Sequence, residues 1–246
     1  MTRRLRIGVA GASGRMGQAV CGLIDSRPEV ALAVRHDLGG RLDDLLAGSD
    51  VVIDFTTSAA SLALTQAAVE RGRPALVIGT TGFDADADAR IATAANTLAI
   101  VKSGNFSLGL NLMAALVRQA AARLAADEWD IEILEAHHRH KRDAPSGSAL
   151  MLGDAAAGGR GTSASSSSNK AETSEARTLG SIGYASLRAG GLVGEHSVIF
   201  ASDDEILTFT HSARDRRLFA RGAVAAALWV RGRPPGLYAM SDVLGL

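Results

Sequence analysis

The sequence predicts an α/β protein. A doubly wound, Rossmann-like parallel-sheet nucleotide domain is expected first, followed by a second α+β domain with a mostly antiparallel sheet. Three observations predict this fold class. Short apolar runs alternate with Ala-rich helical segments over roughly the first hundred residues. A glycine-rich turn follows the first apolar run, and beyond residue 105 the pattern changes to one long amphipathic segment and then to β-like runs.

The elements of the first domain follow from its apolar runs, because continuous apolar runs are typical of strands buried on both faces of a parallel sheet. Five strands are expected, at residues 5–10, 30–34, 51–55, 75–79 and 98–102. Ala-rich segments between several of these runs predict helices at residues 16–26, 59–71 and 85–96. Helices connecting parallel strands in this way cover both faces of the sheet.

The second region has a different pattern of elements. An amphipathic helix is expected at residues 110–126, a strand at 130–138 and a short helix at 149–157. Segment 158–178, rich in Gly, Ser and Thr, predicts a mobile surface loop. β-like runs follow at residues 182–188, 194–202 and 205–211, and Ser202-Asp203-Asp204 between the last two is a hairpin signal. A closing helix is expected at residues 216–230.

The bulk composition excludes several classes of protein. The chain has 246 residues, 47% hydrophobic and 21% charged, with a formal net charge of zero, which gives no general attraction to nucleic acid or to a membrane surface. Its single cysteine, Cys21, excludes a disulfide framework and favours a reducing cytoplasm. The first apolar run is broken by glycines too early for a signal peptide, and the apolar stretch at residues 222–230 is too short to cross a bilayer.

The glycine-rich turn, GASGRMG at residues 11–17, predicts a dinucleotide site. Its glycines allow a tight turn and let a pyrophosphate approach backbone N–H groups at the start of the next helix. Arg15 adds a possible phosphate contact. Asp37, after the second strand, is the candidate for the adenosine ribose hydroxyls, although Arg35 and His36 beside it would attract a 2′-phosphate. The choice between NADH and NADPH is open on these residues.

Three later loops also end predicted strands. They carry Asp54-Phe55-Thr56-Thr57, Gly79-Thr80-Thr81-Gly82 and the stretch from Ser103 to Asn111. Ligands of open α/β sheets bind at the carboxyl ends of the strands, and small residues there leave room for ribose and nicotinamide. Ordinary turn chemistry explains any one of these loops, but three at equivalent places favour a cofactor site.

The stretch EAHHRHKRDAPSGSAL, residues 135–150, holds three of the six histidines of the chain. The start of the following helix, at Ser146-Gly147-Ser148, offers N–H groups to an anion. Helix N–H groups, the Ser148 hydroxyl and the Lys141 ammonium together predict a pocket for a carboxylate, with a neighbouring histidine as proton donor. A zinc site and a solvated basic loop are the alternatives, and the tight histidine spacing without a second Cys/His group disfavours zinc.

Other candidate residues have ordinary structural explanations. Cys21 is expected to pack as a small apolar side chain, which disfavours a thiol-dependent aldehyde dehydrogenase. Glu195, His196 and His211 are expected to be solvent-facing or hydrogen-bonded strand residues. Trp129 and Trp229 are interpreted as core or interface aromatics.

Taken together, these motifs resemble the bacterial dihydrodipicolinate reductase family. The resemblance runs over nearly the whole chain, through VAGASGRMG, VIDFT, VIGTTGF, NFSLGLN, EAHHRHKRDAPSGSAL, GLVGEHSVIF, FARGA and GLYAMSDVL in family order. It implies reduction of a small cyclic dicarboxylate, 4-hydroxy-tetrahydrodipicolinate, by NADH or NADPH in lysine and diaminopimelate biosynthesis. It also implies a cytoplasmic homotetramer, with a dinucleotide-binding domain at residues 1–105 and 216–246 and a substrate-binding and oligomerisation domain at 106–215.

The resemblance further implies roles for single residues. His137 and Lys141 are implied as proton donors, and His138, Gly147 and Ser148 as substrate contacts. The implied cofactor contacts are Gly11, Ala12, Ser13, Gly14, Arg15, Met16, Asp37, Gly79, Thr80, Thr81, Ser103, Gly104, Asn105 and Phe106. No metal ligand is implied. The chain departs from the family pattern at Leu38, Arg142 and the serine-rich loop. A cofactor-binding redox sensor without catalysis and a sugar dehydrogenase remain alternatives.

Overall fold

The computed structural model describes residues 3–162 and 177–246, and it divides into two compact units. One unit comprises Met1–Leu108 with Arg216–Leu246, and the other comprises Gly109–Asp215. Most of the serine-rich loop expected at residues 158–178 lies outside the described residues, and its first two residues belong to a helix. Each unit is described separately below.

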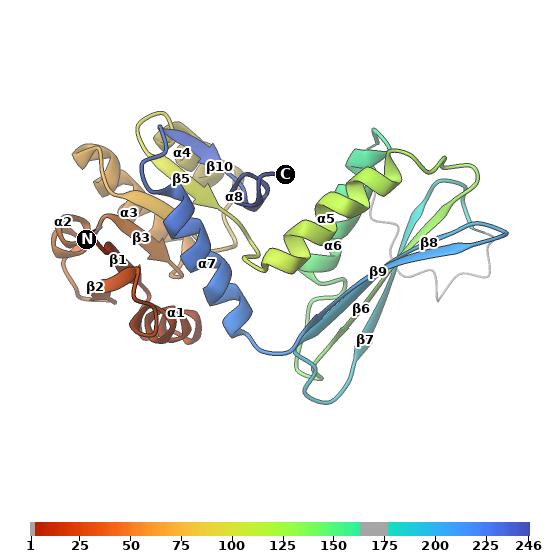
Figure 1. Cartoon of the computed structure of the whole chain (residues 1–246), viewed down its shortest axis with the longest axis horizontal. Coiled ribbons are helices and arrows are strands. Elements are labelled where there is room, and N and C mark those ends of the chain that lie inside the picture. Colours follow the sequence, from red (N-terminus) through yellow and green to blue (C-terminus); the bar gives the residue numbers. More distant parts are fainter. Residues whose placement is uncertain (1–2, 163–176) are drawn as a thin grey trace. The chain divides into compact units, whose positions relative to one another are not determined.

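The first unit contains a six-stranded parallel sheet in the order β10-β5-β4-β3-β1-β2 (Figure 1). Its strands are β1 (Leu5–Ala10), β2 (Val30–His36), β3 (Val51–Asp54), β4 (Ala75–Ile78), β5 (Ala99–Lys102) and β10 (Gly236–Tyr238). The chain moves outward from β1 to β2 in one direction and from β3 to β5 in the other. This order creates a switch point beside β1, where doubly wound folds bind nucleotides.

Helices cover both faces of this sheet. They are α1 (Arg15–Asp25), α2 (Leu42–Gly48), α3 (Ser58–Arg71), α4 (Ala85–Ala94), α7 (Arg217–Val230) and α8 (Met240–Leu244). Two separate apolar cores result. In one, Val20 of α1 and Val224 of α7 pack on the sheet, and in the other Leu64 of α3 and Ile91 of α4 do so. The expected α/β architecture is confirmed.

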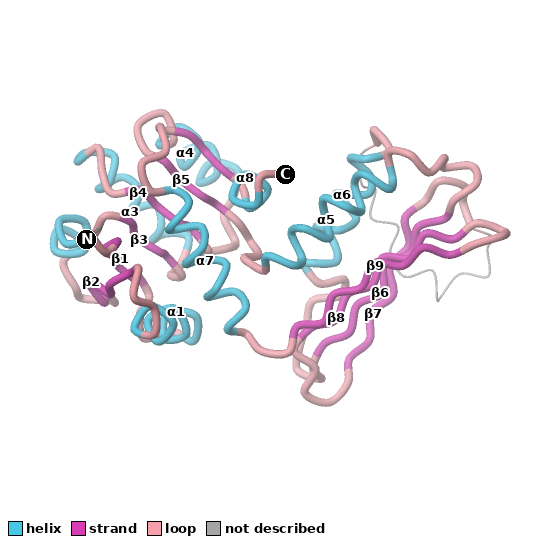
Figure 2. The backbone as a smooth tube through the Cα atoms, viewed as in Figure 1, coloured by secondary structure: helices cyan, strands magenta, loops and turns pink. Residues whose placement is uncertain are grey.

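The second unit contains a four-stranded sheet in the order β7-β6-β8-β9 (Figure 2). Its strands are β6 (Asp130–His137), β7 (Ile182–Arg188), β8 (Gly194–Ala201) and β9 (Ile206–Ala213). Only the β6–β7 pair is parallel among these four strands, so the expected mostly antiparallel sheet is confirmed. Helices α5 (Leu108–Ala121) and α6 (Gly147–Gly159) cover one face, where Val117 and Leu152 pack against Ile133.

Three short elements were not expected from the sequence: α2, β10 and α8. Helix α2 is seven residues long, too short for a clear helical period, and burial of Leu45 and Leu46 stabilises it. Strand β10 has three residues and gains its hydrogen bonds only beside β5.

Helix α5 ends at Ala121, before the expected residue 126. No helix in the described part of the chain is long and apolar enough to cross a membrane.

Candidate active site

The glycine-rich turn connects the end of β1 to the start of α1. Gly11 has a φ of +76°, which favours glycine, and a side chain at Gly17 would collide with the Gly11 carbonyl oxygen. Gly14 is the N-cap of α1 and supplies no side-chain acceptor, so no cap side chain covers the first N–H groups of α1. These features leave a cradle that a pyrophosphate fits, because backbone can approach an anion closely there.

Asp37 lies against this turn. Its carboxylate accepts hydrogen bonds from the Ser13 N–H, at 3.0 and 3.1 Å, and from the Ser13 hydroxyl, at 2.8 Å. The backbone bond from Ser13 and then the hydroxyl bond lower the pKa of Asp37. The Arg35 guanidinium instead forms an ion pair with the Asp25 carboxylate of α1, with 3.4 Å between nitrogen and oxygen. A full negative charge therefore stands beside the loop where the adenosine ribose of a dinucleotide is expected.

The loops after β3 and β4 are joined through a buried acid. Asp54 is fully buried and accepts hydrogen bonds from the Thr56 hydroxyl at 2.6 Å, from the Thr80 hydroxyl at 3.3 Å and from the Ser61 hydroxyl. Burial raises the pKa of Asp54 against these hydrogen bonds. Thr80 also accepts from the Thr56 N–H at 2.9 Å. The acid thus holds the strand-end backbone at residues 79–81 in one conformation.

The remaining candidate cofactor residues are neighbours at the same edge of the sheet. A side chain at Gly79 would collide with the Phe55 ring, and one at Gly104 would reach Thr81 at 3.9 Å. Ser103 and Asn105 are tied together by the Ser103 hydroxyl, which donates to the Asn105 carbonyl at 2.8 Å. The Phe106 side chain is buried in the core. A cofactor contact at Phe106 would therefore use the backbone.

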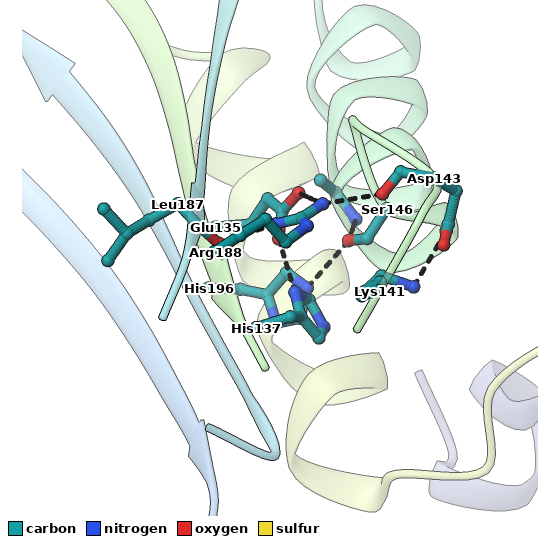
Figure 3. Close-up of polar contacts among 9 residues, drawn as sticks. Glu135, His137, Lys141, Asp143, Ser146, Leu187, Arg188 and His196 are labelled. Atoms are coloured by element: carbon teal, nitrogen blue, oxygen red, sulfur yellow. Dashed lines mark hydrogen bonds and ion pairs between the residues drawn. The ribbon is translucent and has the colours of Figure 1, made fainter. Parts of the chain in front are cut away.

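In the second unit, β6 carries His137 and Glu135 on the face covered by the helices (Figure 3). Glu135 is 1% exposed, and its two carboxylate oxygens accept from Arg188 at 2.7 and 2.9 Å. The second of these oxygens also contacts His137 Nδ1. Burial raises the pKa of Glu135, but hydrogen bonds from Arg188 and His137 outweigh it and lower the pKa to about 2. Glu135 is therefore an anion at neutral pH.

His137 is the histidine in contact with this anion. Burial lowers the pKa of His137, and Glu135 opposes that effect. Since the carboxylate accepts at Nδ1, we assign the proton of the neutral ring to Nδ1, which leaves Nε2 facing away from Glu135. The nearby cations Lys141 and Arg188 lower the pKa of His137 further.

A second histidine, His196 of β8, packs edge-on against His137 with ring centroids 5.1 Å apart. Its Nε2 lies 3.1 Å from the Ser146 hydroxyl, and this hydroxyl accepts from the Ala149 N–H at 3.2 Å as the N-cap of α6 (Figure 3). Burial first, and then His137, lower the pKa of His196 to about 4. A neutral His196 can accept the Ser146 proton, so the bond ties the start of α6 to the sheet.

Comparisons with known proteins identify the family of the chain. The family described as "Dihydrodipicolinate reductase, N-terminus" matches residues 5–106, and "Dihydrodipicolinate reductase, C-terminus" matches residues 109–244. The chain belongs to the dihydrodipicolinate reductase family.

Full-length relatives support that assignment. The 4-hydroxy-tetrahydrodipicolinate reductase of Caulobacter vibrioides is 51% identical, over 100% of this chain and 99% of that protein. Reductase 1 of Mesorhizobium japonicum is also 51% identical, over 97% and 96% of the two chains. The structure of a dipicolinate-bound dihydrodipicolinate reductase from Paenisporosarcina sp. TG-14 has the same fold, with a TM-score of 0.81, 23% identity and 98% and 99% coverage. Dihydrodipicolinate reductases use NADH or NADPH, so the chain is an NAD(P)H-dependent oxidoreductase.

In this member of the dihydrodipicolinate reductase family, the candidate substrate residues gather around the end of β6 and the start of α6. The Lys141 ammonium lies 2.8 Å from the Asp143 carboxylate. The His138 and His140 rings are 6.3 Å apart in the turn that follows the strand. Gly147 and Ser148 are the first residues of α6, and a side chain added at Gly147 would meet open space. Cys21 is buried in α1, within the nucleotide unit, as expected of an apolar packing residue.

Sequence reasoning missed three polar residues of this dihydrodipicolinate reductase site: Glu135, Arg188 and His196. Only His196 carried a sign in the sequence, that it needs a partner, and strand pairing rather than local pattern brings the partners together. His196 interrupts the apolar face that Val198 and Phe200 form at alternate positions of β8, and a polar residue on such a face needs a partner. Arg188 ends β7 directly opposite His137. No group of three possible metal ligands occurs among residues 3–162 and 177–246.

Proposed function

We propose that the chain catalyses the reaction named in its relatives, the NAD(P)H-dependent reduction of 4-hydroxy-tetrahydrodipicolinate to tetrahydrodipicolinate. We propose that this reaction serves lysine and diaminopimelate biosynthesis and takes place in the cytoplasm. The observation that supports it most directly is the pair of buried residues Glu135 and His137 with the half-buried Arg188, next to Lys141 and the start of α6. Such a set combines an anion-binding surface with an imidazole of adjustable pKa.

The first unit would hold the cofactor, which supplies a hydride when bound. Gly11 to Met16 would receive the pyrophosphate, because the N-cap Gly14 places no side chain over the first N–H groups of α1. Asp37 would bind the adenosine ribose. The backbone at Gly79, Thr80 and Thr81 and at residues 103–106 would contact the nicotinamide half, held in place by Asp54.

The second unit would bind the dicarboxylate. One carboxylate would accept from N–H groups at Gly147 and from the Ser148 side chain, at the positive end of α6. Lys141 would turn from Asp143 to the substrate, since Asp143 is exposed and its ion pair is weak in water. His138 lies in the same turn and would contact the ring or a carboxylate of the substrate.

His137 and Lys141 would donate the proton that the reduction requires. In the free protein, burial and the two nearby cations favour neutral His137. A bound dianion offsets those cations and raises the pKa of His137, so that Nε2 gains the proton it must donate. Glu135 then stabilises the imidazolium through Nδ1. Proton availability would thus depend on substrate binding.

We also propose a homotetramer, assembled through the second unit. The face of its sheet opposite α5 and α6 carries Leu134, Leu187 and Ile206, which are 45%, 53% and 70% exposed. Apolar side chains on an open sheet face are typical of a subunit interface. Changing Leu134 to Asp should yield a smaller species by light scattering, whereas Leu38→Asp, at an exposed leucine of the first unit, should not. An unchanged mass for Leu134→Asp would exclude this interface.

The activity is tested with the product of dihydrodipicolinate synthase, generated in a coupled reaction. We expect oxidation of NADH or NADPH that requires this product and is competed by pyridine-2,6-dicarboxylate. Cofactor binding without turnover would instead indicate a redox sensor. Turnover on sugars that ignores the pyridine dicarboxylate would indicate a sugar dehydrogenase.

A further inference from the structure

The first unit has an arginine-lined cavity that the proposed reaction does not use. It has a volume of about 400 Å³ and is lined at its rim by Arg3, Arg73, Arg231 and Arg233. The lining also includes Ala75 and Ala99, the first residues of β4 and β5. The candidate cofactor loops follow the opposite, carboxyl ends of these two strands. The cavity is therefore separated from the nucleotide loops by the length of the sheet.

The positive charge of this cavity is concentrated and largely uncompensated. Four of its 14 lining residues are arginines, whereas the whole chain has 23 arginines in 246 residues. Asp50 is the one carboxylate in the lining, and it is already shared between Arg3, at 2.8 Å, and Arg6, at 3.1 Å. The Arg231 side chain has no hydrogen bond or ion pair to any residue that the structure describes. An anion in the cavity would relieve the repulsion among these guanidinium groups.

Two of the arginines are held in place while keeping donors available. One terminal nitrogen of Arg73 donates to the Ala47 and Ser49 carbonyls, both at 3.3 Å, and Arg233 Nε donates to the Trp229 carbonyl at 3.4 Å. Arg233 also stacks over the Trp229 ring, 4.2 Å from its centroid. A guanidinium has five N–H donors, so these contacts fix the groups without exhausting them. Pre-ordered guanidinium forks are suited to oxyanions, phosphate above all.

We propose that this cavity binds a small phosphate-bearing anion. Its volume lies within the range of about 300–1,000 Å³ that is typical of small-molecule sites. The floor includes Leu98 and Val230, so the ligand is expected to carry an apolar part behind its phosphate groups. The proposal is independent of the reductase activity, because no residue of the cavity belongs to the candidate active site.

Arginine-specific labelling locates such binding directly. Phenylglyoxal modification of the full-length protein is followed by peptide mass spectrometry, with inorganic pyrophosphate as the probe. We expect pyrophosphate to slow the labelling of Arg231 at least about fivefold, while Arg90 on α4, outside the cavity, is labelled as before. Labelling of Arg231 that is unchanged, or slowed equally by sodium chloride of the same ionic strength, would overturn the proposal. Equal protection by citrate would overturn its phosphate class.

A variant pair tests the cavity itself. Arg73→Gln should weaken the protection of Arg231 by pyrophosphate at least about tenfold in concentration, because it removes one ordered guanidinium. Arg123→Gln, an exposed arginine of the second unit, should leave it unchanged. Both variants should turn over substrate as the parent does, since the cavity lies outside the active site. Equal protection of Arg231 by pyrophosphate in the two variants would contradict the assignment of the cavity. If Arg73→Gln fails to fold, the labelling of the parent protein still tests the proposal.

Discussion

At the residue scale, His137 and Glu135 form the contact on which the proposed proton donation depends. Without an acceptor at Nδ1, the ring of His137 is free to change tautomer, and burial opposes its protonation. Glu135 and His137 lie two positions apart on β6, so their side chains point to the same face of the sheet. The alternation of the strand alone therefore brings the carboxylate to the ring. Glu135 is thus a positioning residue, and His137 and Lys141 are the proposed catalytic residues.

Replacing His137 with Gln should lower kcat about 10²–10⁴-fold, the usual contribution of a general acid. Steady-state kinetics with saturating cofactor would measure the loss. His140→Gln, an exposed histidine three residues beyond the end of β6, is the matched control and should cost little. A His137→Gln enzyme with parental kcat would remove the proposed role.

Glu135→Gln should act through the pKa of His137. Loss of the carboxylate lowers that pKa further, so less imidazolium is present as the pH rises. We expect kcat/KM to fall more at pH 8 than at pH 6, with the alkaline limb of the profile moved to lower pH. Glu195→Gln, an exposed glutamate of β8, should leave the profile in place. A uniform loss at every pH would mean that Glu135 has only a structural role.

Asp37 sets the expected cofactor preference. Its carboxylate is ionised and adjacent to the glycine turn, where it repels the 2′-phosphate of NADPH. Asp37→Asn keeps an acceptor for Ser13 but removes the charge, so the NADPH-to-NADH ratio of kcat/KM should rise about tenfold, equivalent to about 1.4 kcal/mol. Asp43→Asn, an exposed acid of α2, is the control. An unchanged ratio would exclude Asp37 from cofactor selection.

At the scale of single elements, α6 would link stability to the proposed substrate binding. Ser146 caps this helix and also meets His196, while the next two residues are proposed substrate contacts. Ser146→Ala should cost about 1 kcal/mol of stability, as N-cap losses do, and should raise the KM for substrate. Asp84→Ala removes the N-cap of α4 and should cost similar stability with no change in that KM. Chemical unfolding and steady-state kinetics separate the two effects.

The elements also explain how far the sequence alone could predict this protein. Long runs such as those of β1 and β8 were placed within a residue or two, because burial on one or both faces gives a clear pattern. Strand β10, helix α2 and helix α8 were missed because they are short and are stabilised by their neighbours. The glycine turn and the histidines at and just after the end of β6 were recognisable locally. Arg188 and His196 were not, because strand pairing brings them to His137 from positions about 50 or more residues away.

On the scale of the whole molecule, the buried histidine makes stability depend on pH. The folded pKa of His196, about 4, lies below the usual value of 6.5, so the unfolded chain binds more protons between these values. The contribution of neutral His196 to the free energy of unfolding is complete above pH 6.5 and is lost as the pH falls towards 4. It amounts to about 3 kcal/mol in all. Urea unfolding at pH 7, 5.5 and 4.5 should show the decline. His196→Asn should flatten it, and the control His140→Asn should not; equal slopes in both would contradict the assignment.

The nucleotide unit is built from both ends of the chain, whereas the second unit is one continuous segment. Helix α7 supplies Ala223, Val224 and Ala227 to one core of the parallel sheet, and β10 pairs with β5 only after α7 has been made. During synthesis on the ribosome, β1 to β5 therefore emerge with one sheet face covered by α1 alone until the last thirty or so residues arrive. The second unit can fold first. Premature termination near residue 216 would leave the parallel sheet with exposed apolar surface, a target for chaperones and proteases.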